Sequence, residues 1–177
     1  MSNPVAYNSS PDDVRPVVII DTREQCPLAI QRFETRRRKL PAGDYGIAGF
    51  SDWDNPAFVV ERKSLEDLCG SLGRGRARFM REVELLRQFR FRGLVIEADP
   101  AQVEAADYRS LIHPASVFGS LDALAVRAGV HVAWAGSHAG AARQVEAWVQ
   151  AFAVGVARDW RRIRGEAVLM DNKPRKG

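Results

Sequence analysis

The chain has 177 residues, 46% of them apolar, which is enough for one well-packed domain and too short for two. Its formal net charge of +4 and pI of about 9.4 mildly favour a polyanionic partner. The two cysteines and three histidines show no metal-type spacing, which argues against a zinc site or a disulfide scaffold. With no apolar signal core and no stretch long enough to span a membrane, we expect a soluble intracellular protein without membrane contact.

The first half of the chain predicts three strands after a polar start. Residues 1–15 contain Pro, Asn and Ser, and we expect them to form a flexible arm. The β-branched run "VVIID" (17–21) is typical of a buried strand. A Pro-Ala-Gly turn then precedes a second strand at 44–50, and "AFVVERK" (57–63) predicts a third.

The second half alternates helices and strands. Ser64 is a helix cap, with Asp67 three residues on, close to a capping-box arrangement. Further helices are expected at 74–91, 115–128 and 138–163, and strands at 93–98 and 130–136. Residues 166–177 read as a flexible basic tail. The order predicts an α/β domain over 16–165, with a central mixed β-sheet flanked by helices.

The end of the third strand carries an acid and two bases. Because side chains alternate along a strand, Glu61 and Lys63 should share one face and Arg62 the other. If strands 44–50 and 57–63 form an antiparallel pair, Asp44 lies beside Glu61. Two converging carboxylates suit Mg²⁺, a hard cation that takes oxygen ligands. Asp21 and Glu24, at the end of the first strand, could complete an acidic rim.

Each of these residues also has an ordinary structural explanation. Asp44 after a glycine is typical of a turn, Glu61 and Lys63 could be a solvated strand end, and Asp67 fits the first turn of a helix through the helix dipole. The joint pattern is much less expected by chance than any one of its members. It therefore indicates a site rather than four unrelated surface residues.

Four motifs carry a family resemblance: "DTRE" (21–24), "GD" (43–44), "ERK" (61–63) and then Asp67. Together with "RARFMREVELL" and "LVIEA" they resemble the nuclease domain of the XPF family of structure-specific endonucleases. That family belongs to the PD-(D/E)xK, restriction-endonuclease-like superfamily, and the match covers roughly residues 16–155. The resemblance implies a restriction-endonuclease-like fold and metal-dependent hydrolysis of phosphodiester bonds.

The resemblance also implies a role for each motif residue. Asp44 and Glu61 would bind Mg²⁺, or Mn²⁺ in its place, with the backbone carbonyl of Arg62 as a third ligand. Lys63 would orient and deprotonate the attacking water. Asp21 and Glu24 would support this metal or a second one. Asp67 would position the lysine or a water molecule. Arg23 and Arg62 would contact nearby carboxylates or the phosphate.

The sequence departs from longer members of that family in two respects. There is little room for a helix between the first strand and the "GD" strand, and no tandem helix–hairpin–helix module follows. It resembles the compact version found in bacteria and their phages, so a partner could supply recognition of branched DNA. We expect a cytoplasmic location in a bacterial or phage-infected cell, or a nuclear one in a eukaryote.

Basic and aromatic residues indicate two further surfaces. The stretch 74–92 contains seven arginines, and those at 74, 76, 78 and 81 (Arg74, Arg76, Arg78, Arg81) could grip DNA phosphates; a solvated basic face is the alternative. "TRRRK" (35–39) is a second candidate patch. Trp148, Phe152 and Trp160 of the final helix could form a homodimer seam, or they could pack in the core, which we favour.

The leading hypothesis is a Mg²⁺-dependent endonuclease acting on branched or flapped DNA, in recombination, repair or replication. A non-catalytic DNA-binding or scaffold subunit with a nuclease-like fold is the alternative from another class. Cleavage at a defined sequence, as by a restriction enzyme, is a third reading, and no evident specificity element supports it.

Overall fold

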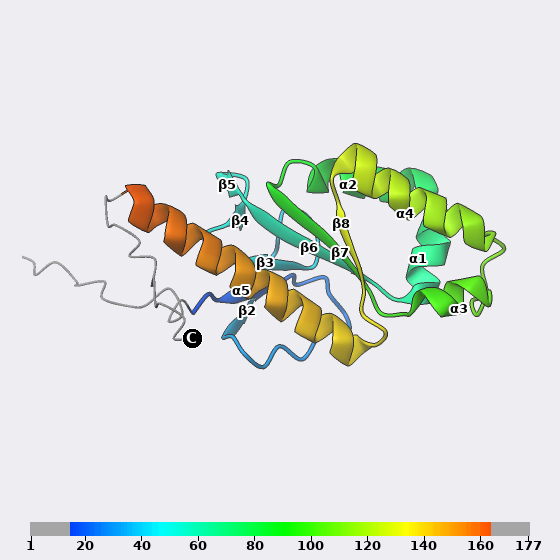
Figure 1. Cartoon of the computed structure of the whole chain (residues 1–177), viewed down its shortest axis with the longest axis horizontal. Coiled ribbons are helices and arrows are strands. Elements are labelled where there is room, and N and C mark those ends of the chain that lie inside the picture. Colours follow the sequence, from blue (N-terminus) through cyan, green and yellow to red (C-terminus); the bar gives the residue numbers. More distant parts are fainter. Residues whose placement is uncertain (1–14, 164–177) are drawn as a thin grey trace, which may run out of the picture.

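The computed structural model describes residues 15–163 (Figure 1). Nearly all of the predicted arm (1–15) and the whole of the predicted tail (166–177) lie outside these residues. A six-stranded mixed sheet forms the centre, in the spatial order β2–β1–β3–β6–β7–β8, and a two-stranded sheet, β4–β5, stands beside it. The strands are β1 (Val18–Ile20), β2 (Thr35–Arg37), β3 (Tyr45–Ile47), β4 (Ser51–Asp52), β5 (Asn55–Pro56), β6 (Phe58–Lys63), β7 (Phe91–Ile96) and β8 (His131–Trp134).

Helices cover both faces of the sheet. The helices are α1 (Leu65–Leu72), α2 (Arg76–Leu86), α3 (Pro100–Glu104), α4 (Pro114–Ala128) and α5 (His138–Ile163). The apolar cluster on one face joins β7 with α1, α2 and α4, whereas the cluster on the other joins β1, β3, β6 and β7 with α5. Figure 1 shows α5 crossing one face, with α2 and α4 together at the opposite end of the molecule. The predicted α/β fold is confirmed.

Strand β6 shows how its sequence sorts residues between the two faces. Phe58 and Val60 belong to the α5-side cluster, whereas Val59 packs with Leu86 and Phe89 on the α2 side. This alternation continues to the charged end of the strand, so Glu61 and Lys63 turn toward α2 and Arg62 toward α5. The strand then stops where Ser64 caps α1, its hydroxyl accepting a hydrogen bond from the Asp67 backbone N–H at 3.1 Å.

Some elements differ from the sequence prediction. Strand β2 was not predicted because "TRR" is exposed and has no apolar alternation. The strand expected at 44–50 is shorter, since only Tyr45–Ile47 pair with β1, and the β4–β5 hairpin follows after a turn. Helix α2 spans Arg76–Leu86 rather than 74–91, and the five-residue α3 was missed. Between β1 and β3 the structure has no helix, as expected.

The direction of the strands brings the motifs to one edge. Strands β1, β6, β7 and β8 all run the same way, because β3 is antiparallel to β1 and to β6 and the β6–β7 and β7–β8 pairs are parallel. Their carboxyl ends therefore share one edge of the sheet, and β3 begins there. Within residues 15–163, no helix is long and apolar enough to cross a membrane.

Candidate active site

Asp44 enters the site through a glycine turn. Its predecessor Gly43 has φ = +67°, and a Cβ there would lie 2.5 Å from the Val59 side chain, so the backbone needs glycine at this point. The Asp44 backbone N–H donates to the Val60 carbonyl at 2.9 Å, and its carboxylate accepts from the Arg62 backbone N–H at 2.8 Å. Tyr45 pairs with Val60 across the antiparallel β3–β6 ladder. The predicted convergence of Asp44 on the end of β6 is confirmed.

Glu61 and Lys63 form a close ion pair. The Lys63 ammonium lies 2.6 Å from Glu61 Oε1, and both side chains are nearly buried. The same ammonium lies 5.5 Å from the centre of the Phe79 ring on α2, a cation–π contact that fixes its direction. The two residues share a face, as the strand alternation predicts, and the structure shows that they also bond to each other.

Burial raises the pKa values of both carboxylates, Asp44 and Glu61. Burial, with the charge of Glu61 adding to it, raises the pKa of Asp44 to about 7. Burial also raises the pKa of Glu61, although Lys63 opposes that shift. For Lys63 burial favours the neutral amine, yet the charge and hydrogen bond of Glu61, with the charges of Glu82 and Asp44, together raise the lysine pKa. Without a bound cation, Lys63 is therefore an ammonium that donates to Glu61.

Asp21 is held by donors from two segments. Its carboxylate is fully buried and accepts from the Arg23 backbone N–H and guanidinium, both at 2.7 Å, and from the Leu40 backbone N–H at 2.5 Å. Burial alone would raise the pKa of Asp21, but these hydrogen bonds lower it. The Asp21 backbone N–H donates to the Asp44 carbonyl at 2.8 Å. Asp21 thus braces the loop that carries Asp44.

Arg62 bridges two carboxylates on the other face of β6. It makes a bidentate contact to Glu24, at 2.9 and 3.0 Å, and reaches Glu97 at 3.2 Å. Although burial opposes its charge, the bonds to Glu24 raise the pKa of Arg62. On the far side of Glu97, the His138 ring Nδ1 lies 2.6 Å from Glu97 Oε1. Three strand ends and the first residue of α5 are joined by this network.

The other predicted site residues lie at different distances from this centre. Asp67 is exposed and accepts a hydrogen bond from the Ser64 hydroxyl at 2.7 Å, so its observed contact is within the helix cap. Arg74 precedes α2, whereas Arg78 and Arg81 lie on α2, three residues apart on the same side of the helix. Arg78 lies 3.5 Å from Glu82. Arg76 turns to α4, donating to Ser120 at 3.1 Å.

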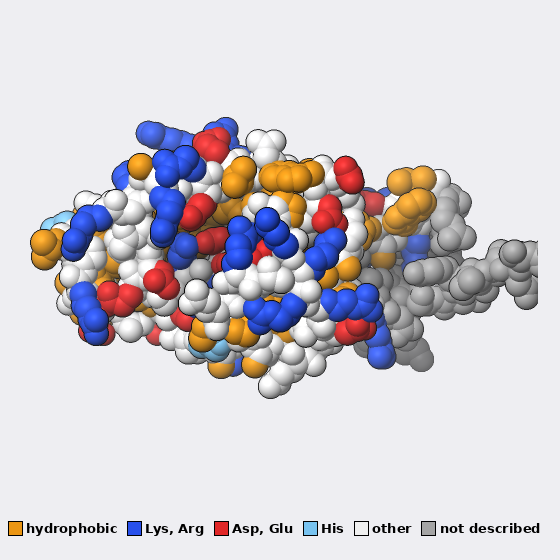
Figure 2. Space-filling view, turned by 180° about the vertical axis from the view of Figure 1, so that it is seen from behind, with side chains coloured by type: hydrophobic (Ala, Val, Ile, Leu, Met, Phe, Trp, Pro, Cys, Tyr) orange, Lys and Arg blue, Asp and Glu red, His pale blue; other side chains and the backbone are white. Residues whose placement is uncertain are grey.

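Basic side chains are spread over one face of the molecule with acidic ones between them (Figure 2). The "TRRRK" segment is part of such a mixture, since Arg36 pairs with Glu34 and Arg38 with Asp52.

In α5, Trp148 packs on Phe91 and Phe152 on Phe58, whereas Trp160 is 60% exposed. The core packing favoured from the sequence is therefore found for Trp148 and Phe152.

The sequence model of the ERCC4 domain family matches residues 20–147, which span all the motifs described above. The chain belongs to the ERCC4 domain family. No curated protein matches its sequence significantly. Its fold is similar to that of XPF from Aeropyrum pernix in complex with DNA, at 20% identity and a TM-score of 0.58, over 82% of this chain and 66% of the other. A structure titled XPF from Aeropyrum pernix gives 18% identity, a TM-score of 0.57, and coverage of 85% and 69%.

The chain thus spans about two thirds of the length of the XPF chains that it matches. These likenesses establish the XPF nuclease fold for this ERCC4 domain, and the resemblance and fold class inferred from the sequence are confirmed. Activity, metal and substrate rest on the arrangement of its own residues.

The ERCC4 domain's carboxylates fit a divalent cation. Asp44 Oδ1 and Glu61 Oε2 accept no hydrogen bond from residues 15–163, while the second oxygen of each carboxylate is occupied. No buried side-chain oxygen of the described residues lacks a partner, so these two oxygens are open to solvent. A cation between them would relieve the repulsion that raises the pKa of Asp44. No cluster of three or more His, Cys, Asp or Glu with metal-binding geometry occurs in the described part of the chain, so water and backbone oxygens would complete the shell.

Sequence reasoning missed Glu97, His138 and Glu82. Glu97 directly follows the apolar strand "GLVI" at the shared carboxyl edge, and that position was a usable signal. His138 is the first residue of α5, which follows β8. Its place next to Glu97 could be predicted only by knowing that β8 pairs with β7. Glu82 acts on Glu61 and Lys63 through its charge from α2, and nothing in the helical pattern distinguishes it from a surface acid.

Proposed function

We propose that this ERCC4 domain is a divalent-metal-dependent DNA endonuclease acting on branched or flapped DNA. The observation that carries the proposal is the meeting of Asp44 and Glu61 beside Lys63, with one oxygen of each carboxylate open to solvent. Membership of the ERCC4 family and the fold shared with DNA-complexed XPF support it. Mg²⁺ is the proposed cofactor and Mn²⁺ its substitute.

The proposed catalytic residues and the residues that support them lie on opposite faces of β6. Asp44 and Glu61, with the Arg62 carbonyl, would hold the cation, which when bound polarises a phosphate oxygen and lowers the pKa of water. Lys63, next to Glu61, would orient the attacking water or contact the phosphate. Arg62, behind the strand, keeps β6 in place through Glu24 and Glu97.

Cleavage of a substrate panel tests this function. Flap, fork, junction and linear DNA are incubated with Mg²⁺, Mn²⁺ or EDTA, using wild type, Asp44→Asn, Glu61→Gln and the exposed control Asp122→Asn on α4. We expect cleavage that needs metal and prefers branched DNA, lost at least a hundredfold in the two site variants, with DNA binding within a fewfold.

Three outcomes would contradict the proposal. Full cleavage by the Asp44→Asn, Glu61→Gln double variant would remove the site assignment. Tight DNA binding with no cleavage of any substrate under any metal would favour the non-catalytic scaffold instead. Cutting of linear DNA at one defined sequence would favour the restriction-like reading.

A homodimer through α5 remains part of the proposal. The large apolar side chains that the described part of α5 leaves exposed are Trp160, at 60%, and Ile163, at 77%. Light scattering over a range of concentrations measures the mass, and a dimer that reverts to monomer in a Trp160→Ala, Ile163→Ala variant would support this seam.

A further inference from the structure

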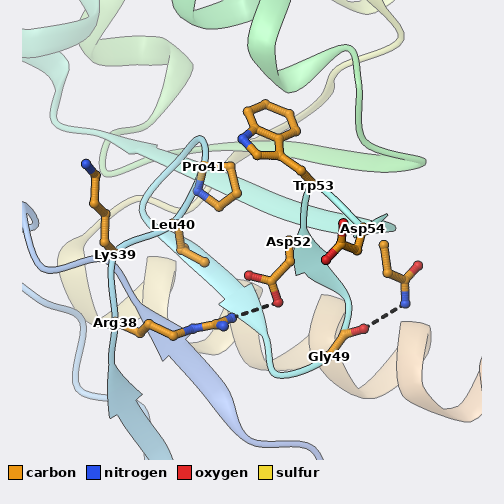
Figure 3. Close-up of a pocket in the computed structure, with 9 residues that line it drawn as sticks. Arg38, Lys39, Leu40, Pro41, Gly49, Asp52, Trp53 and Asp54 are labelled. Carbon is orange, nitrogen blue, oxygen red and sulfur yellow. Dashed lines mark hydrogen bonds and ion pairs between the residues drawn. The ribbon is translucent and has the colours of Figure 1, made fainter.

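A cavity of about 700 Å³ lies between the segment before Asp44 and the β4–β5 hairpin (Figure 3). Arg38, Lys39 and Pro41 line it from the first segment, and Asp52 and Trp53 line it from the hairpin. None of these residues has a part in the proposed chemistry. Within the large surface of the ERCC4 domain, this combination of an exposed indole, cations and carboxylates around a hollow is unexplained by packing.

We infer that this cavity binds an unpaired nucleotide of the DNA strand that enters the active site, with its base stacked on Trp53. The inference rests on the proposed nuclease function and names the part of the substrate that this side of the site recognises. The base would stack on the indole, its polar edge would face the hairpin carboxylates, and its phosphate would face Lys39.

Trp53 has the properties of a stacking platform. Its side chain is 54% exposed, yet its position is fixed because the ring lies 5.9 Å from that of the buried Phe89. Figure 3 shows the indole at the rim of the cavity, on the same side as the Pro41 ring. Stacking on such an aromatic surface requires a base that has left the duplex stack, and it accepts every base.

The charges around the cavity match a nucleotide rather than an apolar ligand. Arg38 is held by Asp52 at 3.1 Å, whereas Lys39 makes no hydrogen bond or ion pair with residues 15–163. The Lys39 side chain extends apart from the acidic side chains in Figure 3, which leaves its ammonium for a phosphate. Asp52 and Asp54 can accept from the N–H groups of a base edge.

The cavity adjoins the candidate carboxylates through two connections. Leu40 lines the cavity, while its backbone N–H donates to Asp21 beside Asp44. On β6, Val59 precedes Glu61 by two residues on the same face and packs against Phe89, on which Trp53 rests. A strand lying over Glu61 would therefore reach Trp53 within the span of a few nucleotides, since alternate residues of a strand are about 6.7 Å apart.

Binding in EDTA tests the inference without any cleavage. Anisotropy of a labelled (dT)₁₂ strand measures affinity, and quenching of tryptophan fluorescence reports stacking. We expect Trp53→Ala to weaken binding about tenfold and remove most of the quenching, and Trp53→Phe to bind within about threefold of wild type. Val126→Ala, which removes an exposed apolar side chain from α4, is the control and should change neither.

A base-deletion series sharpens the assignment. Strands with one abasic position each are compared on wild type and Trp53→Ala, and we expect one position to weaken wild type about tenfold and the variant hardly at all. Melting temperatures of Trp53→Leu, which keeps apolar contact with Phe89, separate stacking from stability: normal melting with lost quenching supports the inference.

The inference would be overturned by Trp53→Ala binding (dT)₁₂ within twofold of wild type, or by equal losses in Trp53→Ala and Val126→Ala. Its failure is distinct from that of the proposed function. If the protein cleaves flaps and Trp53→Ala does not affect binding, only the nuclease proposal is supported. If the protein cleaves no substrate but Trp53 fluorescence is quenched by DNA, only the nucleotide site is supported.

Discussion

Three consecutive residues of β6 divide the charge of the site between two environments. Glu61 and Lys63 turn toward α2 and the solvent-open carboxylate oxygens, whereas Arg62 turns toward α5 and lies between Glu24 and Glu97. The buried guanidinium carries two carboxylate partners and its charge is fully compensated. Asp44 has no cationic hydrogen-bond partner among the described residues, and burial raises its pKa to about 7.

The pKa of Asp44 predicts a pH-dependent stability. Its ordinary pKa of 3.8 rises to about 7 in the folded chain, so the stability that protonated Asp44 contributes is complete below pH 3.8 and lost as the pH rises to about 7. Asp44→Asn avoids this loss. In metal-free buffer we expect it to be more stable than wild type at pH 8, by up to a few kcal/mol, and equal at pH 3.5. Urea unfolding at both pH values measures this, and a difference independent of pH would refute it.

Removing Arg62 should destabilise the fold strongly. Arg62→Met leaves Glu24 and Glu97 nearly buried without their shared cation, and we expect a loss of about 3–5 kcal/mol in the free energy of unfolding, measured with urea. Adding Glu24→Gln to this variant removes one uncompensated charge and should restore part of the loss. If Arg62→Met costs less than about 1 kcal/mol, the network does not stabilise the end of β6.

At the scale of elements, the sequence predicts most clearly what depends on local pattern. Alternation along β6 predicted the shared face of Glu61 and Lys63, and the β-branched run at 17–21 predicted the buried strand β1. Pairings between distant segments could not be derived in the same way. Strand β2 forms because its backbone meets β1 in parallel, although its side chains are all exposed, and Glu97 reaches Arg62 only because β7 lies beside β6.

Helix α2 and the turn before it should contribute to DNA binding. Arg74 and Arg81 are exposed and have no partner among residues 15–163, on a segment whose Phe79 contacts Lys63 of the site. Changing both to Gln should reduce the slope of log affinity against log salt by about one to two, weakening binding equally for all sequences. Arg158→Gln on α5 removes one exposed charge from the opposite helix layer and is the control. An unchanged slope in the double variant would exclude this segment from the interface.

For the molecule as a whole, the topology explains why motifs scattered over residues 21–97 act at one place. Four strands run in the same direction and end at one edge, while β3 begins there with Asp44 directly before it. The site is therefore built from strand ends that a rigid sheet holds, and Trp53 lies in the β4–β5 hairpin that leads into the start of β6. That hairpin could not be placed from the sequence, because "SDWDN" gives turn signals but not the direction of the indole.

A site built from strand ends of the whole sheet should link cation binding to global stability. A cation that binds Asp44 and Glu61 only in the folded chain adds about 1.4 kcal/mol at ten times its dissociation constant, which for a chain of this size is about 3–6 °C in melting temperature. We expect this rise for wild type and Asp122→Asn in Mg²⁺ and its loss in Asp44→Asn and Glu61→Gln, measured by calorimetry at pH 8 against NaCl of equal ionic strength. An equal rise in the melting temperature of all four proteins would show that the cation stabilises the fold elsewhere. Stabilisation through this site should be lost when either carboxylate is removed.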